Sequence, residues 1–356
     1  MRGDFLDFAF RNNFLSVEER GKMKRVRFSS MWLYVFLITG ISLACKNSTI
    51  INSSPSVGTT PSGPAESQIS RDTEGKPFST ATPRTAAYLG DAFQKGGYFL
   101  LALSVSDPAV SGYYLTPEPG NRIILVEMIL GNISGEMLST NPLYALVVDS
   151  NGSAYQSVPA GILDGLPALD LFPGEQTGGI IGFKIPEKAE AARLAYPINF
   201  FGDVFIEASL APAPPDHTPV AVSLSPEVPS SRMGDVVKQF GCSLTVTKVE
   251  DPSIPPAHIS IENGYRMVAI EVIVENVSKP EELFAGGSSV TLVGSDGFVY
   301  LSKYDGRDGR LEFAKLEIGE TAKGWISFIL PENTAPLYLK YQTDIFAGNY
   351  LFAGLS

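Results

Sequence analysis

The chain has 356 residues and carries 38 acidic against 27 basic side chains, which gives a formal net charge of −11. Residues 1–45 hold seven basic and four acidic side chains, so the rest of the chain has 20 Lys and Arg against 34 Asp and Glu. A surface this acidic repels phosphate backbones and anionic head groups, which argues against nucleic acid as a partner.

The N-terminal segment predicts export from the cytoplasm. Basic side chains at 22–27 precede an apolar run at 31–44. A run of ~14 residues suits the core of a signal peptide and falls short of the ~20 that span a bilayer as a helix. Residues 1–45 are therefore expected to be a signal-peptide region, in which Met23 is an alternative start.

The end of this segment points to a lipid anchor. Ile41-Ser42-Leu43-Ala44-Cys45 resembles the lipobox of bacterial lipoproteins, with Cys45 as the lipidation site, although Ser42 stands where leucine is usual. Ser42 and Ala44 also fit a small-x-small secretory cleavage site, so a secreted protein is the alternative. A lipid on Cys45 would anchor the protein in a membrane of the cell envelope, and Lys46 favours the outer membrane in a two-membrane cell.

Composition divides the rest of the chain into four segments. Residues 46–85 are rich in Ser, Thr and Pro, and predict a disordered tether with a root-mean-square reach of roughly 35 Å. Two domains are expected at 86–210 and 232–356, each large enough to build its own hydrophobic core. The proline-rich connector at 211–231 predicts a semi-rigid, extended spacer between two separately usable domains.

The two expected domains are copies of one unit. Identical residues recur at a separation of 144 up to Ser134 and of 145 from Ser150 onward. This period lies far above the 20 to 50 residues of solenoid repeats, so each copy should fold as a separate domain. The matches include Gly120 with Gly264, Asn132 with Asn276, Tyr155 with Tyr300, Gly174-Glu175 with Gly319-Glu320, and Phe183 with Phe328.

The dominant pattern within each copy has a period of two. Every second residue from Val268 to Val274 is β-branched and apolar, and Ile181, Phe183 and Ile185 alternate with Gly182 and Lys184. Successive side chains of a strand point to opposite faces, so these runs are half-buried strands. Turn signals separate the runs, and no helical period is sustained. We expect an all-β fold of two tandem immunoglobulin-like antiparallel β-sandwich domains, with little helix.

An ordered set of short motifs occurs in both copies. A strand ends in Asp-Pro, a Gly-led strand closes in Asn-x-Ser (Asn132-Ile133-Ser134 and Asn276-Val277-Ser278), and Asp/Asn-Gly-x-x-Tyr, Gly-Glu and Gly-x-x-x-Phe-x-x-Pro follow. This set resembles the immunoglobulin-like, telokin-like domain family 4352 of unknown function, over roughly residues 91–210 and 235–356. The resemblance implies a β-sandwich on a bacterial lipoprotein, in the envelope or at the cell surface. It implies no catalytic residues.

A direct search for chemistry finds no catalytic site, metal site or cofactor motif. A hydrolytic triad or a histidine metal site needs a histidine on a rigid scaffold, whereas His217 lies in the connector and His258 in a loop, so both are expected to be solvated. The stretch 149–152 indicates a hairpin turn rather than a calcium loop. The charged stretch 305–310 indicates a solvated loop, and Cys242 a buried core residue.

Differences between the copies suggest a binding surface. The loop at 158–169 is apolar where its counterpart at 303–314 is charged, and we hypothesise that Leu163 and Leu166 contact a partner or the other domain. The alternative is that they plug one end of their own sandwich. Trp325 and Ile329 lie on the face opposite the core residues of their strand, where an exposed patch would suit a ligand. The alternative there is burial under a loop.

These observations favour a non-enzymatic, lipid-anchored cell-envelope protein that presents two β-sandwich domains for binding or adhesion. Its partners would be the membrane, through Cys45, and a protein or glycan ligand that the sequence does not identify. A structural or accessory subunit of an envelope complex is the second hypothesis. An envelope enzyme is the third.

Overall fold

The structure is a computed structural model that describes residues 16–19, 22–25, 88–109, 116–159, 164–198, 204–279, 283–344 and 348–356. The chain divides into two compact units, residues 1–69 and 70–356. In the first unit, β1 (Ser16–Glu19) pairs antiparallel with β2 (Lys22–Arg25). Cys45 and the expected tether at 46–85 lie outside the described residues. Among the described residues, no helix is long and apolar enough to cross a membrane.

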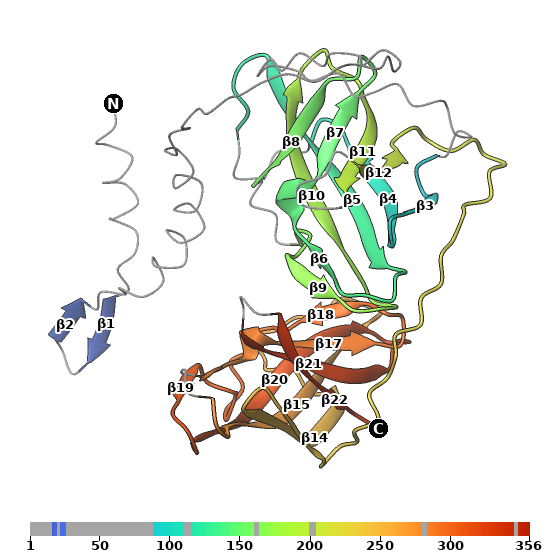
Figure 1. The fold of residues 1–356 in the computed structure, drawn as a ribbon. Helices are drawn as coiled ribbons and strands as arrows, with labels where there is room; N and C mark the ends of the chain where they lie inside the picture. Colours follow the sequence, from blue (N-terminus) through green and yellow to red (C-terminus); the bar gives the residue numbers. More distant parts are fainter. Residues whose placement is uncertain are drawn as a thin grey trace, which may run out of the picture. The chain divides into compact units, whose positions relative to one another are not determined.

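Residues 88–210 of the second unit, called sandwich 1 below, form two antiparallel layers (Figure 1). One layer has the order β10-β5-β4-β3 and the other β12-β11-β7-β8, and pairing of β8 with β10 at two positions joins them into one eight-stranded sheet. The strands are β3 (Ala92–Lys95), β4 (Tyr98–Ser106), β5 (Asn121–Asn132), β7 (Leu146–Asp149), β8 (Ala154–Val158), β10 (Gln176–Pro186), β11 (Ala191–Pro197) and β12 (Phe205–Ser209). A separate ribbon pairs β6 (Leu138–Thr140) with β9 (Leu169–Leu171), and the 3-10 helix η2 spans Pro142–Tyr144.

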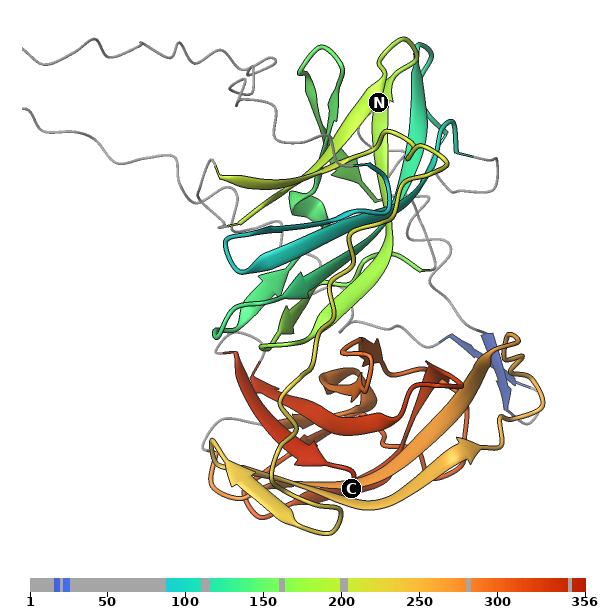
Figure 2. The same ribbon diagram turned by 90° about the vertical axis from the view of Figure 1, so that its right-hand side faces the viewer.

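Residues 232–356, called sandwich 2, repeat this plan (Figure 2). The order β13-β14-β15-β20 matches that of β3-β4-β5-β10, and β18-β17-β21-β22 matches β8-β7-β11-β12. The all-β fold of two antiparallel sandwiches is therefore confirmed. The elements are β13 (Val236–Gln239), β14 (Cys242–Ser253), β15 (Tyr265–Asn276), β16 (Leu283–Ala285), η3 (Gly287–Ser289), β17 (Val290–Gly294), β18 (Val299–Leu301), β19 (Ala314–Leu316), β20 (Thr321–Pro331), β21 (Pro336–Asp344) and β22 (Asn349–Gly354).

Each sandwich has its own apolar core between its two layers. The period-two residues face inward as predicted, because Ile181, Phe183 and Ile185 are buried while Lys184 between them is exposed. Burying one such side chain contributes roughly 1.5–3 kcal/mol relative to leaving it in water. Cys242 lies in the core of sandwich 2 and donates its Sγ–H to the Phe240 carbonyl at 3.5 Å. Burial raises the pKa of this thiol, and its prediction as a buried core residue is confirmed.

The asparagines of the repeated motifs make hydrogen bonds to the backbone at the ends of the strands. Asn132 Nδ2 donates to the Leu171 carbonyl at 2.8 Å, and Asn276 Nδ2 donates to the Leu316 carbonyl at 3.0 Å. Both asparagines are buried, so each satisfies backbone groups that water cannot reach. These bonds fasten the short ribbons β6–β9 and β16–β19 to the long strands β5 and β15.

In each copy an arginine outside the repeated motifs holds the Asp-Pro strand end. Arg122 Nε lies 2.5 Å from Asp107 Oδ1, and its other nitrogens donate to the carbonyls of Pro186 and Ala189. Arg266 makes the equivalent contacts with Asp251 and two carbonyls in sandwich 2. The 144-residue separation of the two arginines was a signal available in the sequence.

The predicted hairpin turn at 149–152 is confirmed. It connects β7 to β8, and the carboxylate of Asp149 accepts hydrogen bonds from the amides of Asn151 and Ser153 and from the Tyr155 hydroxyl. In sandwich 2 the Tyr300 hydroxyl donates instead to Asp296 Oδ2, at 2.6 Å. The carboxylate therefore comes from a different position of the turn in each copy, while the tyrosine is kept.

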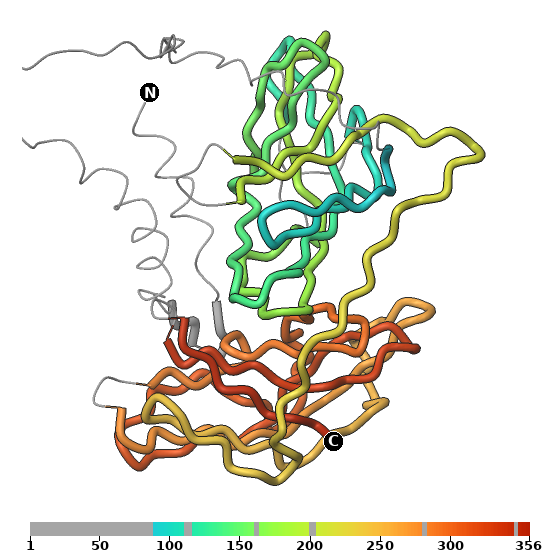
Figure 3. Tube along the Cα trace, turned by 45° about the vertical axis from the view of Figure 1, so that its right-hand side comes forward, coloured from blue at the N-terminus to red at the C-terminus, as the bar shows by residue number. Residues whose placement is uncertain are grey.

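The predicted proline-rich connector makes hydrogen bonds to both sandwiches. The amide of Ala92 donates to the Val220 carbonyl at 2.9 Å, and the amide of Gly354 donates to Ser231 Oγ at 3.1 Å. Figure 3 shows this segment, in yellow, running from sandwich 1 along sandwich 2. Residues 220–222 form no strand, although Val220 bonds to the edge strand β3.

His217 fixes the first half of the connector, which corrects its prediction as a solvated side chain. Its Nε2 lies 2.7 Å from Oδ1 of the buried Asp91, and its ring packs edge-on against Tyr88. Asp91 also accepts hydrogen bonds from the amides of Tyr88 and Val220. His258 is exposed, as predicted.

Candidate functional site: the equivalent ends of the two sandwiches

Of the two leucines proposed for a binding surface, the structure describes only Leu166. Leu163 lies outside the described residues. Leu166 is only 4% exposed and packs in the core of sandwich 1. Its amide donates to the Ile180 carbonyl at 3.2 Å, so the loop is bound to β10 of its own sandwich. This position matches the alternative, in which Leu166 plugs its own sandwich, rather than a contact with a partner or the other domain.

Trp325 is covered by the loop 303–311. Its amide donates to the Gly309 carbonyl at 2.9 Å, and its carbonyl accepts from the Leu311 amide at 2.8 Å. Lys248 Nζ and Arg307 Cζ each lie 5.0 Å from the centre of its ring. Trp325 therefore offers no open aromatic patch, and Ile329 on the same face is also half-buried.

The covering loop is not the solvated loop that its charges suggested. Asp305 is buried and accepts a hydrogen bond from Ser327 Oγ at 2.6 Å. Arg307 donates to Glu250 Oε2 at 2.8 Å and also to Ser253 Oγ. Asp305 and Arg307 thus contact β20 and β14, whereas Lys303 and Asp308 of the same loop are exposed.

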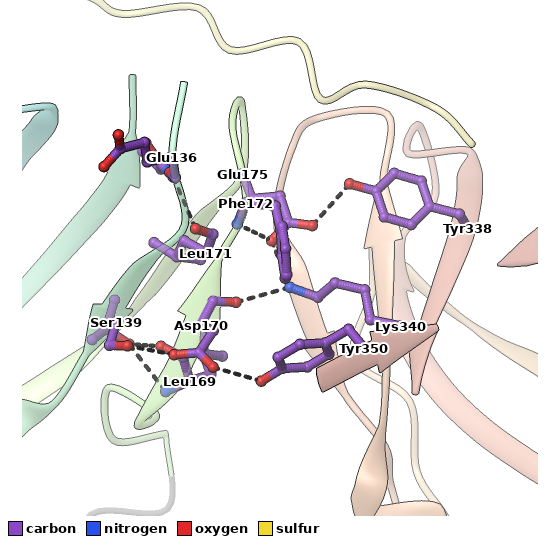
Figure 4. A network of polar contacts seen from close by, with 12 residues as sticks. Glu136, Ser139, Leu169, Asp170, Leu171, Phe172, Glu175, Tyr338, Lys340 and Tyr350 are labelled. Atoms are coloured by element: carbon purple, nitrogen blue, oxygen red, sulfur yellow. Dashed lines mark hydrogen bonds and ion pairs between the residues drawn. The ribbon is translucent and has the colours of Figure 1, made fainter. Parts of the chain in front are cut away.

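One end of sandwich 1 makes a buried polar contact with sandwich 2 (Figure 4). We call this end, formed by β6, β9 and the turn 172–175, the docked end. Glu175 accepts hydrogen bonds from the Tyr338 hydroxyl at 2.8 Å and from Lys340 Nζ at 2.5 Å. The carboxylate and the ammonium are both almost completely buried. Glu175, the glutamate of the repeated Gly-Glu motif, therefore bonds to side chains of the other domain.

Further contacts surround this ion pair. Lys340 Nζ also donates to the Asp170 carbonyl at 2.9 Å, and the Tyr350 hydroxyl donates to Asp170 Oδ2 at 2.8 Å. Phe172 packs edge-on against Tyr350 and Phe352, with ring centres 5.2 and 4.7 Å apart. Outside this group, the Gln176 amide donates to the Gly297 carbonyl at 2.8 Å.

Burial determines the electrostatics of this contact. Removing the Lys340 ammonium from water lowers its pKa, and the neighbouring Glu175 and Asp170 carboxylates and a hydrogen bond to Glu175 oppose that shift. Burial, followed by the charge of Glu175, raises the pKa of Tyr338. The attraction within a buried ion pair offsets its desolvation only when its remaining donors and acceptors are satisfied. Here Glu175 accepts hydrogen bonds from Lys340, Tyr338 and the Phe172 amide, and Lys340 also donates to the Asp170 carbonyl, so the pair is supported on both sides of the contact.

The equivalent end of sandwich 2 carries the same geometry with different side chains. We call this end, formed by β16, β19 and the turn 317–320, the exposed end. The ribbons share one register, because Phe284 pairs with Lys315 as Ser139 pairs with Asp170. Four of the residues at a separation of 145 differ and one is the same. The counterparts in sandwich 2 are Phe284 for Ser139, Phe313 for Ala168, Lys315 for Asp170, Ile318 for Pro173 and Glu320 for Glu175.

Large apolar side chains are open to solvent at the exposed end. Phe284 is 44% exposed, Phe313 70% and Ile318 60%. The rings of Phe284 and Phe313 stack in parallel, with centres 5.7 Å apart and planes inclined by 14°. Glu320, the counterpart of the buried Glu175, is exposed and accepts a hydrogen bond from the Glu317 amide at 2.8 Å.

This arrangement is suited to recognition of a protein surface. Exposed aromatic and aliphatic side chains with charged neighbours are typical of interaction sites. The sequence signal for this surface is the difference between the two copies at one position, where sandwich 2 has Phe313 and sandwich 1 has Ala168. In the described ranges no group of three or more His, Cys, Asp or Glu side chains is placed to hold a metal ion.

Comparisons with known proteins agree with the two-domain fold. The model of the family described as "Domain of unknown function (DUF4352)" matches residues 88–205 and 231–351. No curated protein matches the chain.

Two solved structures from Bacillus subtilis are similar. The yjhA protein has 16% sequence identity, with 35% of this chain and 99% of that chain covered and a TM-score of 0.29. The proposed lipoprotein ycdA has 11% identity, covering 34% and 38%, with a TM-score of 0.28. The secreted protein MPT63 of Mycobacterium tuberculosis has 17% identity, covering 37% and 97%, with a TM-score of 0.27. Because the family model matches more than half of the residues, the chain belongs to the DUF4352 family and carries two tandem copies of its domain.

Proposed function

We propose that this protein is a non-enzymatic, lipid-anchored component of the bacterial cell envelope that binds a protein partner through the exposed end of sandwich 2. Cys45 would carry the lipid, and residues 46–85 would lift the two sandwiches off the membrane. The observation that carries the proposal is the pair of equivalent ends. One end makes a protein contact within the chain, and the other presents Phe284, Phe313 and Ile318 to solvent.

The side chains at the exposed end support a protein ligand more than a glycan. Aromatic residues are enriched at the centres of protein interfaces, where surrounding contacts exclude water from them. A docked apolar surface of the partner would bury Phe313, while Lys315 and Glu320 at its margin would give orientation. Adhesion to a host or matrix protein and assembly with another envelope protein both use this chemistry.

Site-specific photocrosslinking tests the binding face. The full chain is produced in cells with p-benzoyl-phenylalanine at position 313, and the expected result is a crosslinked product of defined mass that the same label at Tyr265 does not give. Tyr265 is a matched control because it is an aromatic residue, 45% exposed, at the opposite end of β15 from the exposed end.

Substitution checks the same surface. The double variant Phe284→Ser, Phe313→Ala carries the side chains that sandwich 1 has at these positions, so it should fold and should lose the partner. A crosslink that forms equally well from position 265, or a partner retained in full by the double variant, would contradict the proposed face.

Metabolic labelling tests the anchor. A palmitate analogue should label the wild-type chain, and the label should be absent from Cys45→Ala. Labelling that persists in this variant would contradict lipidation at Cys45, and no labelling of the wild type would favour the secreted alternative.

A further inference from the structure

Sandwich 1 contains a cavity that none of the contacts described so far uses. Its volume is about 410 Å³, within the range of about 300–1,000 Å³ that ligand sites occupy. It lies beside the ribbon β6–β9 and strand β11. Its walls include Tyr98, Tyr144, Tyr196, Met137, Leu138 and Ile198.

Hydrogen bonds hold two of the tyrosine walls in place. The Tyr98 hydroxyl donates to the Ser139 carbonyl at 3.2 Å, and the Asn141 amide donates to the Tyr196 hydroxyl oxygen at 2.8 Å. The two rings stand 6.0 Å apart and are tilted by 56°. Both rings are also buried in the core, so binding does not have to order these two walls.

The lining restricts the chemistry of a ligand. Among the described residues no charged side chain lines the cavity, so an ion would lose its hydration without gaining a partner from them. The hydroxyls of Tyr98 and Tyr196 are already bonded to the chain, and Ser139 Oγ donates to Asp170 at 2.5 Å. A sugar, which needs many polar partners, is therefore disfavoured. Aromatic rings at these separations and a methionine thioether instead favour an aromatic guest.

We infer that this cavity binds a neutral aromatic group, either a free small molecule or an aromatic side chain of a bound protein. The site belongs to sandwich 1 alone. At the equivalent positions sandwich 2 has Cys242 for Tyr98 and Ser289 for Tyr144. The strand registers support this equivalence, because Tyr98 pairs with Asn132 as Cys242 pairs with Asn276.

Methyl NMR of the full chain, labelled at its methionine methyl groups, tests the inference with p-cresol as the probe. The Met137 resonance, assigned by its loss in Met137→Leu, should shift saturably as p-cresol is added. Met267 in the core of sandwich 2 should not shift, which makes it an internal control for non-specific partitioning. Absence of a Met137 shift, or parallel shifts of both resonances, would overturn the inference.

Variants locate the site. Leu138→Phe and Ile198→Phe each fill the cavity and should weaken p-cresol binding by tenfold or more, whereas Leu143→Phe, on an exposed residue outside the lining, should not change it. Phe313→Ala should also leave it unchanged, so failure of this site and failure of the exposed end remain distinguishable. Equal affinity in both filled variants would contradict the assignment.

Competition of other aromatic compounds with p-cresol identifies the source of the aromatic group. Displacement of p-cresol by N-acetylphenylalaninamide supports a protein side chain as the natural guest. Displacement by phenol but not by the amide supports a free small molecule. If neither compound competes, the Met137 shift does not report an aromatic site and the inference fails.

Discussion

Glu175 and Glu320 occupy equivalent places in the two sandwiches and have opposite surroundings. Glu175 is buried against Lys340 and Tyr338, whereas Glu320 is exposed. The same Gly-Glu motif forms the turn in both copies, with each carboxylate accepting the amide three residues before it. Only the tertiary setting separates a turn-forming glutamate from one that also fixes two domains together.

Lys340→Ala should destabilise the protein by about 3–5 kcal/mol, because it leaves the Glu175 charge buried and unpaired. The double variant Glu175→Gln, Lys340→Met removes both charges and should be much less destabilised than the single variant. Unfolding in urea measures these free energies. Glu320→Gln is the matched control, since an exposed site of this kind should change stability by no more than about 0.5 kcal/mol. A loss of stability in Lys340→Ala no larger than that in Glu320→Gln would contradict the stabilising role of the buried ion pair.

Glu250 provides a prediction about titration. Hydrogen bonds from Lys248 and Arg307 lower the pKa of its carboxyl to about 2. Its folded pKa is below the unfolded value, so the stabilisation it contributes is present above the unfolded pKa and is lost as pH falls toward 2. Arg307→Ala should raise the Glu250 pKa toward its ordinary value of 4.5, which an NMR titration of its side-chain carboxyl carbon can follow. An unchanged pKa would mean that Lys248 alone sets it.

The loop 303–311 turns Trp325 from an outward residue into a covered one. Asp305→Ala removes the buried acceptor of Ser327 and should loosen the loop. In a chain that also carries Trp32→Phe, Trp325 is the only tryptophan, and its emission should shift to longer wavelength with greater quenching by acrylamide. Lys303→Ala, which removes an exposed charge of the same loop, serves as the control. Identical emission in wild type and Asp305→Ala would show that the loop does not depend on this contact.

The connector depends on Asp91 in a similar way. Burial raises the pKa of this carboxyl, but hydrogen bonds from the amides of Tyr88 and Val220 and from His217 outweigh it and leave the pKa lowered. The stability contributed by ionised Asp91 is therefore present above the unfolded pKa and lost as pH falls through the folded one. Asp91→Ala should cost about 2 kcal/mol or more. It should also speed hydrogen exchange of the Val220 amide, and unchanged exchange would contradict a fastened connector.

The long strands were predictable from the sequence, and the short ribbons were not. The run from Val268 to Val274 shows its period over enough residues to identify both the strand and its buried face. The three-residue strands β6, β9, β16 and β19 are too short to show any period. Because those ribbons form the docked and exposed ends, the periodicity that revealed the fold could not reveal the candidate binding surface.

Partners distant in sequence explain the other differences. Arg307 meets Glu250, and His217 meets Asp91, across 57 and 126 residues. A charged or proline-rich stretch looks solvated when only its neighbours in sequence are considered. The internal repeat was the better guide, because equivalent positions with unequal side chains, such as Ala168 and Phe313, mark where the surfaces of the two copies differ.

Contacts of the docked end and the connector join the two sandwiches into one folded unit. The exposed end of sandwich 2 takes no part in these contacts. Glu175 with Lys340, Asp170 with Tyr350, and Gln176 with Gly297 join the sandwiches directly. A partner bound at the exposed end would therefore meet sandwich 2 while sandwich 1 stays attached behind it. These contacts favour one two-domain folded unit over two independent modules.

The distance distribution between the sandwiches tests this account most directly. Spin labels at Gln156→Cys and Lys238→Cys, both exposed positions, would be attached to a chain carrying Cys45→Ser, in which the buried Cys242 does not react. Pulsed electron paramagnetic resonance should give one narrow distance distribution in this otherwise wild-type chain. The distribution should broaden when Lys340→Ala is added. A broad distribution already present without Lys340→Ala would show two independently moving domains and would contradict the account.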